Sequence, residues 1–147
     1  MRLLATWMLV LHLFCAQATA AQVIVNDSAI DFPLPAPELR LIFSMQKVYW
    51  PDGQKIQVFI LSPGSEIHKE FCFKQLDMMP YMLQRRWDRL VYAGTGERPI
   101  ILKNEAEMQA QISRTPGSIG YVAAPVLSDD NLSDDNRVTR SLYETSP

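Results

Sequence analysis

Turn residues and apolar runs alternate from Ile42 to Val122, and this alternation constrains the fold more than any other feature of the sequence. Each apolar run has the period of a strand or of a helix, and glycine, proline, serine or asparagine separates it from the next. Strands that alternate with helices form an α/β structure. The sequence therefore predicts one α/β unit with a mixed or parallel sheet flanked by helices.

Local signals place these elements along the chain. Ser65 and Asn104 are typical helix N-caps, Asn104 being followed by Glu107 as in a capping box, and Gly94 follows a helical pattern that it should end. The predicted strands are residues 22–26, Lys55–Leu61, Pro99–Leu102 and Ile119–Val122. The predicted helices are Glu38–Met45, Glu66–Leu76, Tyr81–Tyr92 and a segment from Asn104 to about Arg114.

Residues 1–20 have the pattern of a secretory signal peptide. Arg2 precedes an apolar run from Leu3 to Phe14, and Ala18 and Ala20 are small residues on either side of Thr19. The run is too short to span a bilayer, although an uncleaved membrane anchor is the alternative. We expect cleavage near Ala20 and a periplasmic or secreted protein.

Cysteine and charge limit the function of the remaining chain. With Cys15 in the predicted signal peptide, Cys72 is left without a disulfide partner, and its apolar surroundings predict a buried, inert thiol. Residues 21–127 hold 11 basic and 11 acidic residues, whereas residues 128–147 hold five acidic residues against two arginines. We therefore expect an α/β lobe over residues 21–127, an acidic and flexible tail over residues 128–147, and no nucleic-acid partner.

Metal binding and catalysis find little support among these residues. His12 lies in the predicted signal peptide, so His68 is the only other histidine, and it has no cysteine at a ligand spacing. Ser65 and His68 are three residues apart on one predicted helix, but no carboxylate is specified to orient the histidine. The sequence predicts no metal site, no cofactor and no enzymatic activity.

The loop from Ser62 to Ser65 is the remaining candidate site. A strand followed by a Gly/Ser loop and a helix leaves several backbone N–H groups unpaired at the positive end of the helix dipole. Ser62, Gly64, Ser65 and His68 are therefore candidate ligands of a small oxyanion. In the alternative, Ser65 only caps the helix and water takes the other N–H groups; the sequence leaves both open.

Two further groups of residues favour structural roles. Arg85, Arg86 and Arg89 lie on one predicted helix, Arg85 and Arg89 on its face away from Leu83 and Trp87. Asp88 lies among them and partly neutralises them, and such a face is usually solvated. Trp50 and Trp87 fit core or turn packing better than a ligand platform.

The order of several motifs resembles the phosphate-binding periplasmic proteins of ABC transporters, over about Leu39 to Val122. The motifs are Ile42-Phe43, Trp50-Pro51-Asp52-Gly53, Ser65 with Phe71, Gly94-Thr95-Gly96 and Pro116-Gly117-Ser118-Ile119-Gly120-Tyr121. The resemblance implies a single lobe of a type II periplasmic-binding-protein-like fold. It also implies phosphate or another small oxyanion as ligand, and a membrane permease or sensor as partner.

The sequence departs from this family in the ligand loop and in length. Glu66 and Ile67 replace the Gly-Thr of the family's loop, and His68 stands where the family has an arginine. One lobe also offers half of a two-lobed cleft, which a homodimer could complete. Two functions follow as expectations: weak oxyanion binding at the Ser65 helix, or an accessory interaction module that keeps the fold without high-affinity binding.

Overall fold

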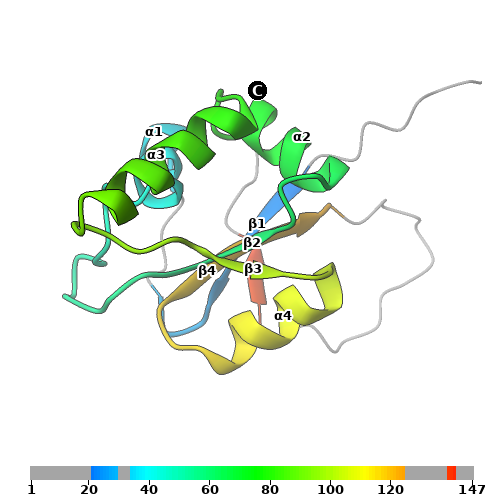
Figure 1. Cartoon of the computed structure of the whole chain (residues 1–147). Coiled ribbons are helices and arrows are strands. Elements are labelled where there is room, and N and C mark those ends of the chain that lie inside the picture. Colours follow the sequence, from blue (N-terminus) through cyan, green and yellow to red (C-terminus); the bar gives the residue numbers. More distant parts are fainter. Residues whose placement is uncertain (1–20, 30–33, 125–138, 142–147) are drawn as a thin grey trace, which may run out of the picture.

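The computed structural model describes residues 21–29, 34–124 and 139–141 (Figure 1). Nine elements follow one another in these ranges. The strands are β1 (Ala21–Asn26), β2 (Gln57–Leu61), β3 (Ile100–Leu102), β4 (Ser118–Ala123) and β5 (Thr139–Ser141). The helices are α1 (Ala36–Phe43), α2 (Glu66–Lys74), α3 (Pro80–Tyr92) and α4 (Glu105–Arg114).

The strands form one mixed sheet in the order β3-β2-β4-β1-β5. β2 is parallel to both of its neighbours, with Phe59 opposite Ile100 and Val58 opposite Ile119. β1 is antiparallel to β4 on one side and to β5 on the other. The predicted α/β fold with a mixed sheet is confirmed.

Helices cover both faces of the sheet. Figure 1 shows α1, α2 and α3 on one side and α4 on the other. Because both faces are covered, β2 and β4 are almost continuously buried instead of alternating between buried and exposed residues. α4 approaches β4 so closely that a Cβ added at Gly120 would lie 2.4 Å from Met108 Sδ. Tyr121, the next residue, contributes its ring to the opposite layer, 4.0 Å from the Phe71 ring.

The turn at Trp50-Pro51-Asp52-Gly53 and the turn at Pro116-Gly117 are joined to each other by hydrogen bonds. Trp50 is buried, and its indole Nε1 donates to the Gly117 carbonyl at 2.9 Å. The same carbonyl accepts from Gln57 N at 3.2 Å, at the start of β2. These contacts fix the N-terminal ends of β2 and β4 relative to each other.

Most turn and cap signals in the sequence are confirmed. Ser65 Oγ accepts from the His68 N–H at 3.2 Å, and Asn104 Oδ1 accepts from the Glu107 N–H at 2.9 Å. Gly94 has a φ of 66° just after α3, as a left-handed helix stop requires. Trp50 and Trp87 are both buried, as predicted for core residues.

Several elements begin or end one or two residues away from their predicted bounds, and two differences have a particular origin. α1 begins at Ala36 instead of Glu38 because Pro37 lies in its first turn, where a missing N–H leaves no hydrogen bond unmade. β5 lies within the predicted acidic tail, for which the sequence indicates no strand, and pairs Thr139 with Asn26. The predicted signal peptide and the rest of the tail lie outside the described residues.

We expect Gly117→Ala to destabilise the protein more than Gly94→Ala does. Both glycines have a left-handed backbone, with φ of 71° and 66°, which costs an alanine about 1–2 kcal/mol. A Cβ at Gly94 meets nothing within 4 Å, whereas one at Gly117 lies 2.9 Å from the Lys55 carbonyl oxygen. Overpacking at Gly117 should add about 1–3 kcal/mol. Urea unfolding of the two variants measures the difference, and equal losses would contradict the packing argument.

Candidate functional site

The loop between β2 and α2 folds as the sequence predicts for a helix start. Ser65 N donates to the Ser62 carbonyl at 2.9 Å, which closes a tight turn around Pro63 and Gly64. Ser65 has extended backbone angles, and its side chain caps the helix through the His68 N–H. Its own carbonyl accepts from Lys69 N at 3.1 Å as the first helical bond. The turn therefore brings Ser62, Gly64 and Ser65 together at the start of α2.

Two backbone N–H groups are left at this helix start. In any helix the first N–H groups have no partner within it, and at α2 these belong to Glu66 and Ile67. Among the described residues, neither group donates to a protein acceptor. Ser62 and Gly64 are exposed, so solvent reaches the turn. The site can offer backbone donors, the Ser62 hydroxyl and the helix dipole to a small anion.

Gly64 is not required by the conformation of this turn. Its φ lies outside the left-handed region, and an added Cβ would lie 4.0 Å from Ser62 Oγ, an ordinary contact distance. The absence of a side chain instead leaves the space beside the helix start open.

The Glu66 carboxylate repels an anion at this turn less strongly than its position at the start of the helix suggests. Its side chain is 87% exposed, and Oε1 accepts from Lys69 Nζ at 2.6 Å. The ion pair offsets part of the negative charge at the start of the helix, and solvent screens the remainder.

The structure separates His68 from the other three candidate residues. The residue is 1% exposed, and its ring points into the core between α2 and β4. Nδ1 lies 2.5 Å from Tyr121 Oη, and Nε2 lies 3.4 Å from Cys72 Sγ. Both ring nitrogens thus have partners inside the protein, and the prediction that this side chain serves the anion is corrected. Only the backbone N–H of His68 faces the turn, where Ser65 uses it.

The hydrogen bonds around His68 form a directed chain. The N–H of Leu61 donates to Tyr121 Oη at 3.0 Å, so the tyrosine hydroxyl hydrogen is free to donate to His68 Nδ1. The histidine hydrogen is then on Nε2, directed at Cys72 Sγ. In this order Nδ1 accepts a hydrogen bond and carries no hydrogen, so the imidazole is neutral.

Burial shifts all three titratable groups toward their neutral forms. It lowers the pKa of His68 to about 4 and raises the pKa of the Cys72 thiol to about 12. Burial also raises the pKa of Tyr121, against the lowering effect of the Leu61 hydrogen bond. The prediction that the Cys72 thiol is buried is confirmed, and its raised pKa is consistent with an inert thiol. The group has no charged base or nucleophile at neutral pH, so we assign it to the core.

Sequence reasoning missed the partners of His68, although one signal was present. His68 and Cys72 are four residues apart, on the helix face that also carries Phe71, so all three should point the same way. Tyr121 could not be found in this manner, because its contact with His68 depends on how α2 crosses the sheet.

The described residues contain no arrangement that suggests a metal site or a membrane span. No group of three or more His, Cys, Asp or Glu side chains in these ranges is placed to hold a metal ion. Among the helices that the structure describes, none is both long and apolar enough to cross a bilayer.

We expect stability to fall as the pH drops from 7 to 5, because unfolding lets His68 bind a proton. The unfolded ring titrates near 6.5 and the folded ring near 4. The contribution is therefore complete above pH 6.5 and decreases as the pH falls, by about 2 kcal/mol at pH 5. Urea unfolding at several pH values measures the slope. His68→Gln should flatten the slope between pH 7 and 5 while lowering stability overall; an unchanged slope would argue against a buried neutral ring.

Comparison with known proteins finds solved structures with a similar fold but assigns the chain to no family. No family model and no curated protein matches the sequence. In structure the chain is similar to PstS from Borrelia burgdorferi, with a TM-score of 0.51 and 18% identity over 70% of this chain and 40% of PstS.

Two other solved structures match more weakly. One is an ABC-type phosphate transport receptor from Vibrio cholerae, with a TM-score of 0.47 and 14% identity over 71% of this chain and 40% of the receptor. The other is a possible phosphate binding protein from Planctomyces limnophilus, with a TM-score of 0.46 and 17% identity over 71% of this chain and 35% of that protein. This chain thus spans less than half the length of each of these proteins, and its fold resembles one lobe of PstS.

Proposed function

We propose that this chain is a secreted or periplasmic binding lobe that holds a small oxyanion, phosphate in the first instance, at the start of α2. The observation that carries the proposal is the pair of unpartnered N–H groups on Glu66 and Ile67, beside the exposed Ser62 and Gly64. A helix N-terminus with free donors suits a phosphate or sulfate oxygen. The likeness to PstS supports a binding function, and the sequence resemblance to phosphate-binding proteins supports the choice of anion.

Binding at this site should be weak. His68 replaces the arginine expected from the family, and its ring is buried, so no bidentate cationic fork reaches the anion. A single lobe also leaves the anion in contact with water, where hydrogen bonds and charges contribute less than in a closed cleft. A site that has backbone donors but no second lobe to close over the anion should bind it with low affinity and exchange it rapidly with solvent.

The proposed role is non-enzymatic. The Ser65 hydroxyl accepts the His68 N–H, and the His68 ring contacts Tyr121 and Cys72, so this serine and this histidine ring do not form a nucleophile and base. In this proposal a membrane permease or sensor receives the lobe, as the resemblance implies.

We expect phosphate to produce saturable heat in isothermal titration, and Ser65→Asp to remove it. Asp caps helices as well as Ser does, so the fold should be retained while a carboxylate repels the anion from the same N–H groups. Ser65→Asn is the matched control, because it caps equally without charge and should keep affinity within a few fold.

A flat titration of the unmodified protein at millimolar phosphate would contradict the proposal. Equal binding by Ser65→Asp and Ser65→Asn would place the anion elsewhere. Urea unfolding of each variant shows whether α2 is intact, so a loss of heat is assigned to the site only where stability is unchanged.

We also expect export to leave Ala21 as the first residue. β1 begins at Ala21, directly after the predicted cleavage position, and Ala21 is 3% exposed with its carbonyl accepting from Gln75 Nε2 at 3.1 Å. Expression of the full sequence in an export-competent bacterium, followed by N-terminal sequencing, tests this. A cytoplasmic product that retains Met1 would contradict the proposed localisation.

A further inference from the structure

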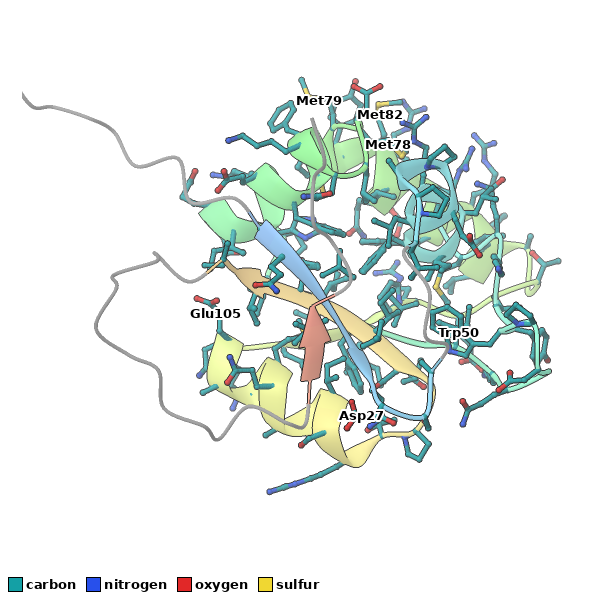
Figure 2. The ribbon with its side chains drawn as sticks, turned by 180° about the vertical axis from the view of Figure 1, so that it is seen from behind. Asp27, Trp50, Met78, Met79, Met82 and Glu105 are labelled. Carbon is teal, nitrogen blue, oxygen red and sulfur yellow. The ribbon has the colours of Figure 1, made fainter. Side chains whose placement is uncertain are left out.

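The outer face of α3 carries an amphipathic groove that the oxyanion site does not use. The groove has a volume of about 270 Å³. Tyr81 is 60% exposed and Met82 is 45% exposed, although α3 is anchored below by buried Leu83 and Trp87. Figure 2 shows Met78, Met79 and Met82 gathered at one end of the helical layer. The residues that line the groove are Met78, Tyr81, Met82, Arg85, Arg86 and Arg89.

The arginines of this face are not neutralised, contrary to the expectation from the sequence. Asp88 Oδ1 accepts from Arg98 Nη2 at 2.6 Å and from Gln84 Nε2 at 3.1 Å, and so is engaged away from the groove. Among the described residues, none of the three lining arginines forms an ion pair, whereas Lys69 and Lys74 on α2 each pair with a glutamate. The α3 groove therefore has three positive charges and no acidic residue in its lining.

The composition of the α3 groove is that of a protein interface more than of a solvated helix face. Interfaces are enriched in Tyr, Met and Arg and depleted in Lys, and the groove has no lysine. Arg85 and Arg89 are one turn apart, which spaces two planar guanidinium groups along the helix for successive carboxylates. Tyr81 and Met82 provide apolar surface at the other end.

An acidic segment with the matching character lies in this same chain. Residues 128–135 carry Asp129, Asp130, Asp134 and Asp135, with Leu132 between the two pairs, and no basic residue. The chain enters this segment after β4 and leaves it into β5, both in the sheet next to β1. α3 instead packs on the helical layer, with Trp87 Nε1 donating to the Phe43 carbonyl at 2.9 Å. The two strands that flank the segment thus lie in the sheet, whereas the groove lies on the helical layer.

We propose that the α3 groove binds the acidic segment 128–135 of a second copy of this chain. Charge complementarity carries the assignment, because the groove is the described surface with three unpaired arginines and the segment has four aspartates. Two molecules that exchange their segments form two identical contacts related by a two-fold axis, so the assembly closes as a dimer.

Charge reversal on each side tests the proposal with the full mature chain. Variant one is Arg85→Glu with Arg89→Glu, and variant two is Asp129→Lys with Asp130→Lys, Asp134→Lys and Asp135→Lys. We expect the unmodified protein to dimerise at low ionic strength, and each variant alone to weaken dimerisation by about tenfold or more. An equimolar mixture should restore it, because each reversed groove then meets a reversed segment and each natural groove a natural segment. Sedimentation equilibrium gives the dissociation constants.

A matched control for variant one reverses the same number of positive charges elsewhere. Lys103 and Arg114 are exposed and form no ion pair among the described residues, and they lie at the two ends of α4, across the sheet from α3. Lys103→Glu with Arg114→Glu should leave dimerisation unchanged. Phosphate titration should be unaffected in variant one, so a failure of the oxyanion site and a failure of this interface are distinguishable.

The remaining outcomes would overturn the proposal. A protein that stays monomeric at all concentrations has no such contact. Dimerisation that survives Arg→Glu uses another face, and dimerisation lost in variant one but kept in variant two uses a different acidic surface. Cosedimentation of the unmodified monomer, but not of variant one, with vesicles of anionic phospholipid would assign the α3 groove to a lipid surface instead.

Discussion

The hydroxyl of Tyr121 joins the sheet to α2 and thereby positions the loop from Ser62 to Ser65. It accepts from the N–H of Leu61, the last residue of β2, and donates to the ring of His68 on α2. The ring below it stacks on Phe71 at 4.0 Å, which in turn meets Phe43 of α1 edge-on at 4.7 Å. The Tyr121 side chain of β4 therefore contacts both the last residue of β2 and the first turns of α2, and so positions the two elements relative to each other. The turn from Ser62 to Ser65 lies between these two fixed points.

This arrangement explains why the candidate site is built from backbone groups. In the buried position of His68 a charged ring would lose its hydration without a counter-ion, so the ring stays neutral and serves as a core hydrogen-bond partner. No cationic side chain of α2 replaces it at the turn, since Lys69 is paired with Glu66. What remains is the helix dipole and the N–H groups of the first turn. Such donors can bind any small oxyanion and do not select a particular one. Their interaction with an anion is strongest when water is excluded.

The sequence predicts local structure here better than it predicts contacts. Caps and stops at Ser65, Asn104 and Gly94 are determined by a few neighbouring residues, so their signals are complete within a short window. β5 has no such signal, because its pairing with β1 depends on a distant strand and not on its own composition. His68 shows the same limit: spacing places it on the helix near Ser65, but its rotation toward Tyr121 follows from the packing of α2 on the sheet. The charge of the α3 groove was misjudged for a similar reason, since Asp88 is close in sequence but pairs with Arg98.

The two surfaces with proposed functions lie at opposite ends of one short helix, which makes them independent. The oxyanion turn precedes α2, whereas the α3 groove begins with Met78, just after α2 ends. Nine helical residues separate the two ends by roughly 14 Å at about 1.5 Å per residue. That is further than any side chain from the groove reaches, and it exceeds the distance over which exposed charges interact strongly at physiological salt. The side chains of the groove therefore do not contact an anion bound at the turn. Under the two proposals, charge reversal in the groove acts on the association of two copies and not directly on the backbone donors of the anion site.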